Sequence, residues 1–275
     1  MTQSNSSASS QPRTPATRRV LRWFKSEALR SDAAYRLYLR LKFGTRKLPA
    51  APKLPLPNRA LKSRAEWEQV LAEAKAARLP LHRGGEKNWD HLAAVSAILA
   101  ETTPAARVLD AGAEFYSNVL PTLYAYGYRN LYGVNLAFTR ESRRGPIRYM
   151  PGDITRLPFE DGYFDAASSM SVIEHGVPLA AWLREMYRVL KPGGLLIAST
   201  DYYPTAINTA GKTAYGAPIK IFTRAEIETV VRLAESLGFE RTGELDLDCD
   251  EKPVQWQQYG LEYSFVIFTL RKRKM

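Results

Sequence analysis

The stretch Val108-Leu109-Asp110-Ala111-Gly112-Ala113-Glu114 decides the fold of this chain. Its apolar start, followed by an acid and a glycine, predicts a buried strand that ends in a tight turn. A second apolar run begins after Ser117 and predicts a helix. A strand, a turn and a helix in this order form the corner at which open α/β sheets bind their ligands.

Apolar and polar segments continue to alternate along the chain. The pattern predicts strands at 107–111, 130–135, 146–150, 164–170, 194–200, 240–247 and 262–270, and helices at 64–78, 88–102, 117–126, 179–189 and 224–237. Alternating strands and helices predict a mainly parallel sheet with helices on both faces. No helix separates the last two strands, so the final strand is expected to run antiparallel. Thr223 and Glu226 have the spacing of a capping box at the start of the last helix.

The composition is that of a globular chain with one α/β domain and extensions. The net charge of +11 is uneven, because residues 1–64 hold 15 Lys and Arg and only 2 Asp and Glu. Cys249 is the only cysteine, which excludes an intrachain disulfide and a Cys-rich zinc site. The three histidines lack metal-ligand spacing, so no metal is expected. No apolar run is long enough to cross a bilayer, which predicts a cytoplasmic protein.

The chain divides into four parts. Residues 1–15 are poor in apolar side chains and predict a disordered tail. Residues 16–47 predict a basic amphipathic helical leader, in which Ser31 and Asp32 cap a second helix. Residues 48–62 form a proline-rich linker, and residues 63–275 form the main domain.

Two interpretations fit the leader equally well. On a helical wheel, residues 16–43 place aromatic and aliphatic side chains on one half and arginines and lysines on the other. This is the pattern of a helix that lies at a membrane surface. It is also the pattern of a helix that covers the domain and leaves its arginines in solvent. A cleaved targeting peptide is a third interpretation.

Four further segments carry a family resemblance. They are Tyr132-Gly133-Val134-Asn135, Gly152-Asp153-Ile154, Phe164-Asp165-Ala166 and Leu190-Lys191-Pro192-Gly193-Gly194. With the opening stretch, they resemble the class I S-adenosylmethionine-dependent methyltransferases of type 11, over roughly residues 88–270. The resemblance implies a Rossmann-like sheet with an antiparallel last strand. It favours a sulfonium cofactor over a nicotinamide, because Gly-x-Gly-x-x-Gly is absent.

The resemblance implies a cofactor site that begins in the opening turn. Asp110, Ala111 and Gly112 match the start of the family's glycine motif, whereas Glu114 and Tyr116 replace its later glycines. Glycine is used there because the backbone approaches the ligand closely. Either the loop follows another path, with Glu114 pairing the cofactor's ammonium group, or the site is inactive.

The same resemblance places the rest of the cofactor. Asn135 stands where the family has a ribose-binding acid, and the segment 137–146 is short for the helix that normally follows. Asp153 would accept a hydrogen bond from the adenine amino group while Ile154 packs on the ring. Ser169 and Met170 line the cofactor side. For Asp153, an ordinary turn after a strand is the alternative.

Methyl transfer depends mainly on positioning, and a hydroxyl acceptor benefits from a general base. The candidate catalytic residues are Glu174, His175 and Asp201, since they follow the strands whose ends form the ligand crevice. A structural or positioning role is the alternative for each of them.

Two segments near the C-terminus indicate the class of methyl acceptor. Residues 215–223 and 247–256 resemble a bacterial subgroup with the altered motif Asp-Ala-Gly-x-Glu-Phe-Tyr-Ser, whose members accompany surface polysaccharide biosynthesis. The implied reaction is O-methylation of a sugar hydroxyl, on a glycan or glycolipid. Nucleic-acid acceptors are not expected, because the chain lacks Asn/Asp-Pro-Pro-Tyr/Phe and Pro-Cys motifs. The alternatives are a non-catalytic protein that binds a membrane or partner through its leader, and a nucleotide-binding oxidoreductase.

Overall fold

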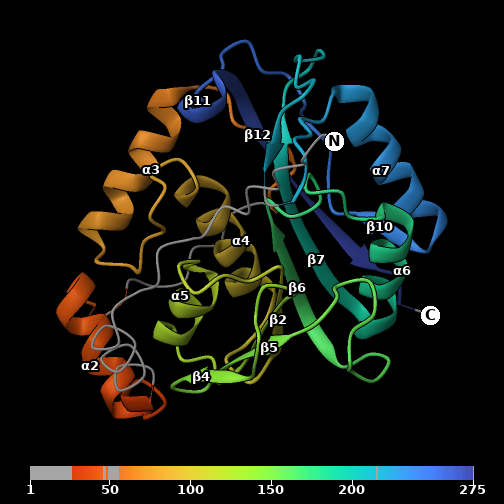
Figure 1. Ribbon diagram of the computed structural model, residues 1–275. Helices are drawn as coiled ribbons and strands as arrows, with labels where there is room; N and C mark the ends of the chain where they lie inside the picture. Colours follow the sequence, from red (N-terminus) through yellow and green to blue (C-terminus); the bar gives the residue numbers. More distant parts are fainter. Residues whose placement is uncertain (1–26, 46–47, 49–55, 215, 275) are drawn as a thin grey trace, which may run out of the picture.

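The computed structural model describes residues 27–45, 48, 56–214 and 216–274. A large sheet separates α4 and α5 from α6 and α7, and α2 and α3 lie on the side of α4 and α5 (Figure 1). The helices are α2 (Asp32–Phe43), α3 (Arg64–Ala76), α4 (Asn88–Glu101), α5 (Val119–Ala125), α6 (Leu179–Val189) and α7 (Arg224–Ser236). The expected helices from residue 64 onward are thus confirmed to within a few residues.

The sheet has the order β1-β12-β7-β6-β2-β3-β5-β4, and β10 and β11 also pair with β12. Its strands are β1 (Arg59–Ala60), β2 (Arg107–Ala111), β3 (Asn130–Asn135), β4 (Ser142–Arg144), β5 (Ile147–Pro151), β6 (Phe164–Met170), β7 (Leu190–Tyr202), β10 (Phe239–Arg241), β11 (Val254–Trp256) and β12 (Leu261–Lys272). The pairs among β7, β6, β2, β3 and β5 are parallel. The last strand runs antiparallel to β7, as expected. The Rossmann-like α/β fold is therefore confirmed.

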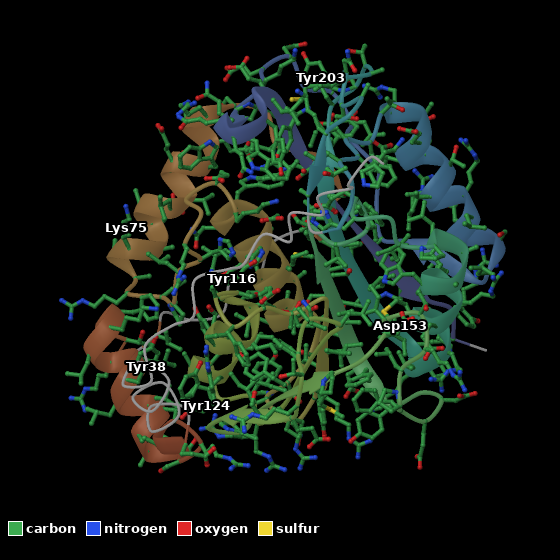
Figure 2. The ribbon with its side chains drawn as sticks, in the orientation of Figure 1. Tyr38, Lys75, Tyr116, Tyr124, Asp153 and Tyr203 are labelled. Carbon is green, nitrogen blue, oxygen red and sulfur yellow. The ribbon has the colours of Figure 1, made fainter. Side chains whose placement is uncertain are left out.

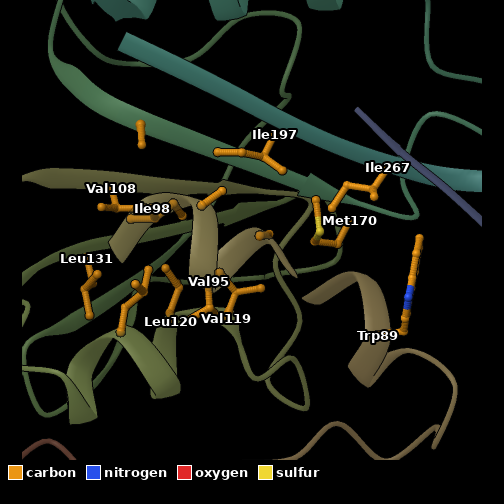
Figure 3. Close-up of a cluster of buried hydrophobic side chains, with 14 of the residues drawn as sticks. Trp89, Val95, Ile98, Val108, Val119, Leu120, Leu131, Met170, Ile197 and Ile267 are labelled. Atoms are coloured by element: carbon orange, nitrogen blue, oxygen red, sulfur yellow. The ribbon is translucent and has the colours of Figure 1, made fainter. Parts of the chain in front are cut away.

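Each central strand sends alternate side chains to opposite faces of the sheet, which explains why both faces are covered by helices. Val108 and Ile197 pack with α4 and α5, whereas Leu109 and Ala198 pack with α6 and α7. Figure 3 shows the first of these clusters, where Val108, Ile98 and Leu131 lie among other buried apolar side chains. The continuous apolar runs of the sequence thus correspond to strands buried on both faces.

The predicted strand 240–247 is shorter than expected. Within this stretch, only the residues of β10 pair with β12, and the chain bends at Thr242 and Gly243. Asp246 then forms a bridge with Arg59, and its carbonyl accepts from Ala60 N at 2.8 Å. β1 therefore lies inside the range predicted to be a linker, because it completes the sheet edge beside β12.

α7 begins with the expected capping box. Thr223 Oγ1 accepts from the backbone amide of Glu226, and Glu226 Oε2 accepts from the backbone amide of Thr223 at 2.9 Å. Both amides would otherwise lack a partner at the helix start.

A short strand replaces the helix that the family places after β3. β4 pairs antiparallel with β5 across a turn at Gly145, whose φ is +54°. The sequence indicated that 137–146 was too short for a helix, and the structure shows what takes its place.

α2 covers the domain with its apolar side. Tyr35 and Leu39 are buried, and the Tyr35 ring packs 5.2 Å from the ring of Tyr124. The hydroxyl of Tyr124 donates to Asp32 at 2.7 Å, and Tyr124 and Tyr38 are both labelled in Figure 2. Ser31 occupies the N-cap position but makes no side-chain cap hydrogen bond. In this part of the leader, the covering interpretation therefore holds; residues 1–26 and 49–55 lie outside the described residues.

In the described part of the chain, no helix is long and apolar enough to cross a membrane.

Candidate active site

The predicted site residues gather around one cavity of about 970 Å³. It lies at the carboxyl ends of β2, β3, β5, β6 and β7, where open α/β sheets bind ligands. The lining includes Asp110, Gly112, Glu114, Asn135, Asp153, Ile154, Met170, Glu174, His175 and Asp201. Ala111 and Ser169 do not line it, because both side chains are fully buried within the sheet. The volume is near the upper end of ligand pockets, roughly 300–1,000 Å³.

The opening turn is fastened to β3 by Asn135. Its amide nitrogen donates to the carbonyls of Gly112 at 3.2 Å and Ala113 at 2.9 Å, and its Oδ1 accepts from Ala137 N at 2.8 Å. These bonds use both amide hydrogens, so neither is left for a ribose hydroxyl. Asn135 organises the turn, and only its remaining oxygen lone pair is left for a ligand.

The bulky side chains that replace the family's glycines do not close the cavity. Glu114 turns toward Asn135, whose Nδ2 lies 3.4 Å from Glu114 Oε1. The Tyr116 ring packs edge-on against His82 at 5.3 Å and is 40% exposed at the cavity rim. Tyr116 and Asp153, both labelled in Figure 2, line the cavity from the loops after β2 and β5. The turn therefore leaves the cavity open beside Gly112.

Asp110 is buried at the end of β2. Ser168 donates to it at 2.8 Å and Ser117 at 3.4 Å. Burial raises the pKa of Asp110 to about 6 despite these hydrogen bonds, which lower it. Gly112 follows with a φ of +94°, a conformation that side chains rarely adopt.

The expected adenine side of the cavity is formed by a turn after β5. Asp153 Oδ1 accepts from the backbone amide of Thr155 at 2.8 Å and from its hydroxyl at 2.7 Å. Ile154 is buried beside it while still lining the cavity. One carboxylate oxygen of Asp153 thus stabilises the turn, as the alternative interpretation expected. The hydrogen bond from adenine to Asp153 stays a prediction.

Buried acids form the opposite side of the cavity. Glu174 is 1% exposed, and Thr200 donates to its Oε2 at 2.9 Å. Its Oε1 is buried without a partner among the described residues. Burial, together with the charge of Asp201, raises the pKa of Glu174 to about 8. Burial and, to a smaller extent, the charge of nearby Lys87 lower the pKa of His175 to about 4, so the ring is neutral at neutral pH.

Several cavity residues come from parts of the chain that the motifs did not indicate. Residues 82–87, which precede α4, contribute His82 and Lys87, and the C-terminal strands contribute Trp256 and Tyr263. Lys87 Nζ lies 3.4 Å from Asp201 Oδ1 and forms a partly buried ion pair with it. A run of histidine, arginine and lysine just before a helix was the available signal, but only the fold shows that it faces Asp201.

The cavity also contains a histidine with a fixed tautomer. Asn118 uses its amide to donate to Pro80 and Asn88, so its Oδ1 must accept from His91 Nδ1 at 2.8 Å. Burial lowers the pKa of His91 to about 3, and Lys87 adds to this effect. His91 is therefore a neutral hydrogen-bonding group of the wall. No group of three or more His, Cys, Asp or Glu side chains in the described ranges is arranged to hold a metal ion.

The raised pKa of Glu174 predicts a specific pH dependence of stability. In the unfolded chain this carboxyl ionises near pH 4.5, but in the folded protein it does so only near pH 8. Between these values the unfolded state has lost a proton that the folded state keeps. Stability should therefore fall as the pH rises through this window, by up to about 1.4 kcal/mol per pH unit.

We expect Glu174→Gln to flatten this decline in urea unfolding measured from pH 5 to pH 8, because an amide cannot ionise. Glu240→Gln, at an exposed position, is the control and should keep the wild-type slope. An unchanged slope in Glu174→Gln would show that Glu174 ionises normally.

Part of the chain is similar to known methyltransferases. Residues 109–198 match the family model described as a methyltransferase domain. Demethylmenaquinone methyltransferase of Mycolicibacterium gilvum is 37% identical over 107 residues, which are 38% of this chain and 46% of that protein. Sterol 24-C-methyltransferase of Debaryomyces hansenii is 30% identical over 119 residues, which are 40% and 31% of the two chains.

Among solved structures, an S-adenosylmethionine dependent methyltransferase from Mesorhizobium loti has a TM-score of 0.48 and 18% identity, covering 67% of this chain and 97% of that chain. This chain spans less than half the length of the two sequence relatives it matches. The match of residues 109–198 to the methyltransferase domain model agrees with the resemblance inferred from the sequence.

Proposed function

We propose that this chain is an S-adenosylmethionine-dependent methyltransferase that methylates a hydroxyl group. The observation that carries the proposal is the single cavity that joins the opening turn at Asp110 and Gly112 to the buried carboxylate of Asp201. The first group of residues matches the family's cofactor motif, and Asp201 supplies a proton acceptor beside it. The methyltransferase domain at 109–198 supports the same assignment.

The chain itself has two tasks in this reaction. S-adenosylmethionine, when bound, supplies a methyl group that is already activated by a positively charged sulfur. The cavity walls must orient the acceptor oxygen toward that methyl carbon and accept the hydroxyl proton. During transfer to the acceptor oxygen, the carboxylate of Asp201 would accept the hydroxyl proton, and the neutral thioether of S-adenosylhomocysteine would leave.

Asp201 suits the role of proton acceptor better than its neighbours. Glu174, with a pKa of about 8, holds its proton at neutral pH, so it is a hydrogen-bond donor there. His175, with a pKa of about 4, is a weak base. We therefore assign Glu174 and His175 to positioning.

The acceptor we propose is a sugar hydroxyl on a surface glycan or glycolipid. Support comes from the resemblance of residues 215–223 and 247–256 to the bacterial subgroup described above. The matched relatives are named for other acceptors, demethylmenaquinone and sterols. The sugar therefore needs a direct test.

The test is methyl transfer from isotopically labelled S-adenosylmethionine to a panel of bacterial glycans and glycolipids, followed by mass spectrometry. We expect one O-methylated sugar product, and a rate reduced by roughly 10²–10⁴-fold in Asp201→Asn. Wild-type activity in Asp201→Asn would remove Asp201 as the proton acceptor. Labelling of a quinone or sterol but no glycan would overturn the sugar assignment.

We also propose that the basic leader brings the enzyme to an anionic membrane. The positive charge of the leader supports this proposal. In α2, Tyr35 and Leu39 pack on the domain, so the side chains left to meet a membrane are exposed ones such as Arg36 and Arg40. Flotation with vesicles rich in anionic lipid tests this proposal. Binding should fall when residues 1–45 are deleted, and equal binding without them would exclude the leader's role.

A further inference from the structure

The Lys87 side chain contacts three residues from different strands or loops at the cavity wall that contains Asp201. It is the N-cap residue of α4, and its Nζ lies 2.5 Å from Ser171 Oγ and 3.4 Å from Asp201 Oδ1. The same ammonium group lies 3.9 Å from the centre of the Phe265 ring. Its side chain is 20% exposed and that of Asp201 only 4%. Three different interactions therefore hold one buried cation at this wall.

The charged and titratable groups around Asp201 come from three parts of the fold. Lys87 and Asp90 belong to the start of α4, Glu174 to the loop after β6, and Tyr263 to β12. Of these groups, Lys87 is the cation and the others are acids. Burial raises the pKa of Asp201, whereas the Lys87 ammonium and hydrogen bonds from Lys87 and Tyr263 lower it. An isolated buried carboxylate would be unstable as an anion.

Ser171 shows that Lys87 also fixes the backbone beside Asp201. Its φ of +52° is unusual for a residue with a side chain, and such strain at a site requires support from its surroundings. The Lys87 ammonium donates a hydrogen bond to the Ser171 hydroxyl, and the backbone amide of Ser171 donates to Ser199 O at 3.0 Å. Ser171 begins the loop that carries Glu174 and His175, so the loop's course depends on this contact.

We propose that Lys87 is a positioning residue for the methyl acceptor: it keeps Asp201 ionised and immobile, so the site takes an acceptor that donates a hydrogen bond through an uncharged hydroxyl. This inference rests on the proposed methyltransferase function. An anionic group on the acceptor would face the carboxylate of Asp201, whereas the Lys87 ammonium is already paired with that carboxylate.

The inference can be tested without knowing the acceptor. Infrared difference spectroscopy at pH 7 detects the carbonyl stretch of protonated buried carboxylic acids, and Glu174→Gln identifies the contribution of Glu174. Because the charge of Asp201 raises the pKa of Glu174, Asp201→Asn is compared in the Glu174→Gln background. There it should remove no such band, because Asp201 is ionised. Lys87→Met should add one band, and Lys87→Met/Asp201→Asn should lack it.

Two controls separate charge from packing. Lys87→Arg keeps the positive charge and should show no added band. Lys191→Met removes a lysine that lies outside the cavity and pairs with Asp165 at 2.5 Å. In this variant, the carbonyl band expected for a protonated Asp201 should not appear. Loss of a band when Asp201→Asn is added to Glu174→Gln would overturn the proposal, even if Lys87→Met does not fold.

A calorimetric titration of the wild type with S-adenosylhomocysteine separates this inference from the function on which it rests. If the spectra behave as expected but no binding is measured, the Lys87–Asp201 pair stands and the methyltransferase assignment fails. If S-adenosylhomocysteine binds but Asp201 proves to be protonated, the assignment stands and the role of Lys87 is wrong.

Discussion

Gly112→Ala should abolish cofactor binding and destabilise the protein by about 2–4 kcal/mol. Two independent causes act at this position. The residue has a φ of +94°, and a Cβ atom would lie 2.3 Å from Val172 Cγ2. Both Gly112 and Val172 line the cavity, so any movement that relieves the contact changes the shape of the site. We expect affinity for S-adenosylhomocysteine to fall by roughly 100-fold or more, which is about 2.7 kcal/mol.

Gly127→Ala is the matched control for this substitution. Gly127 has a similar φ of +99°, but its nearest neighbour, Pro104, would be an ordinary 3.8 Å from the new Cβ. It should show only the conformational cost, about 1–2 kcal/mol, and bind the ligand normally. Gly112→Ala/Val172→Ala should recover the packing part of the stability loss. Unchanged binding in Gly112→Ala would mean that the ligand does not approach this turn.

The second large effect is expected for Asn88→Ala, because Asn88 ties together the segment that forms one wall of the cavity. Its Oδ1 accepts from His82 N at 2.8 Å and from Asn118 Nδ2 at 3.2 Å. Its amide donates to the carbonyls of Gly85 at 3.0 Å and Gly84 at 3.1 Å. Asn88 is fully buried, so alanine would leave several buried polar groups without partners, at about 1–3 kcal/mol each.

We expect Asn88→Ala to lower the free energy of unfolding by about 3 kcal/mol or more in urea titrations. Hydrogen exchange of residues 82–87 should accelerate even where the rest of the protein stays protected. Asn130→Ala removes one exposed hydrogen bond, to Ala105 O at 2.9 Å, and should cost no more than about 0.5 kcal/mol. Equal stability losses in the two variants would contradict the role assigned to Asn88.

The fold was largely predictable because its signals are local. The apolar runs at 107–111 and 130–135 define β2 and β3 without reference to the rest of the chain. The absence of a helix between the last two strands was enough to predict an antiparallel final strand. Strand 240–247 was wrong in extent because pairing with β12 ends at Arg241, and Asp246 instead pairs with Arg59, which is distant in sequence.

The site was predictable only in part. Motif positions brought Asp110, Asp153 and Asp201 to one cavity because strand ends meet at one edge of a parallel sheet. The sequence could not show that the Asn135 amide donates its hydrogen bonds to the opening turn, or that Lys87 pairs with Asp201. Such contacts join segments up to 114 residues apart and depend on side-chain direction.

The central claim is that the turn from Asp110 to Ser117 binds S-adenosylmethionine despite Glu114 and Tyr116. Isothermal titration of the full chain with S-adenosylmethionine and S-adenosylhomocysteine tests it most directly. We predict one binding site per chain for each ligand, with the heat lost in Gly112→Ala and kept in Gly127→Ala. No measurable heat at about 1 mM of either ligand, which corresponds to binding weaker than about −4 kcal/mol, would contradict the claim.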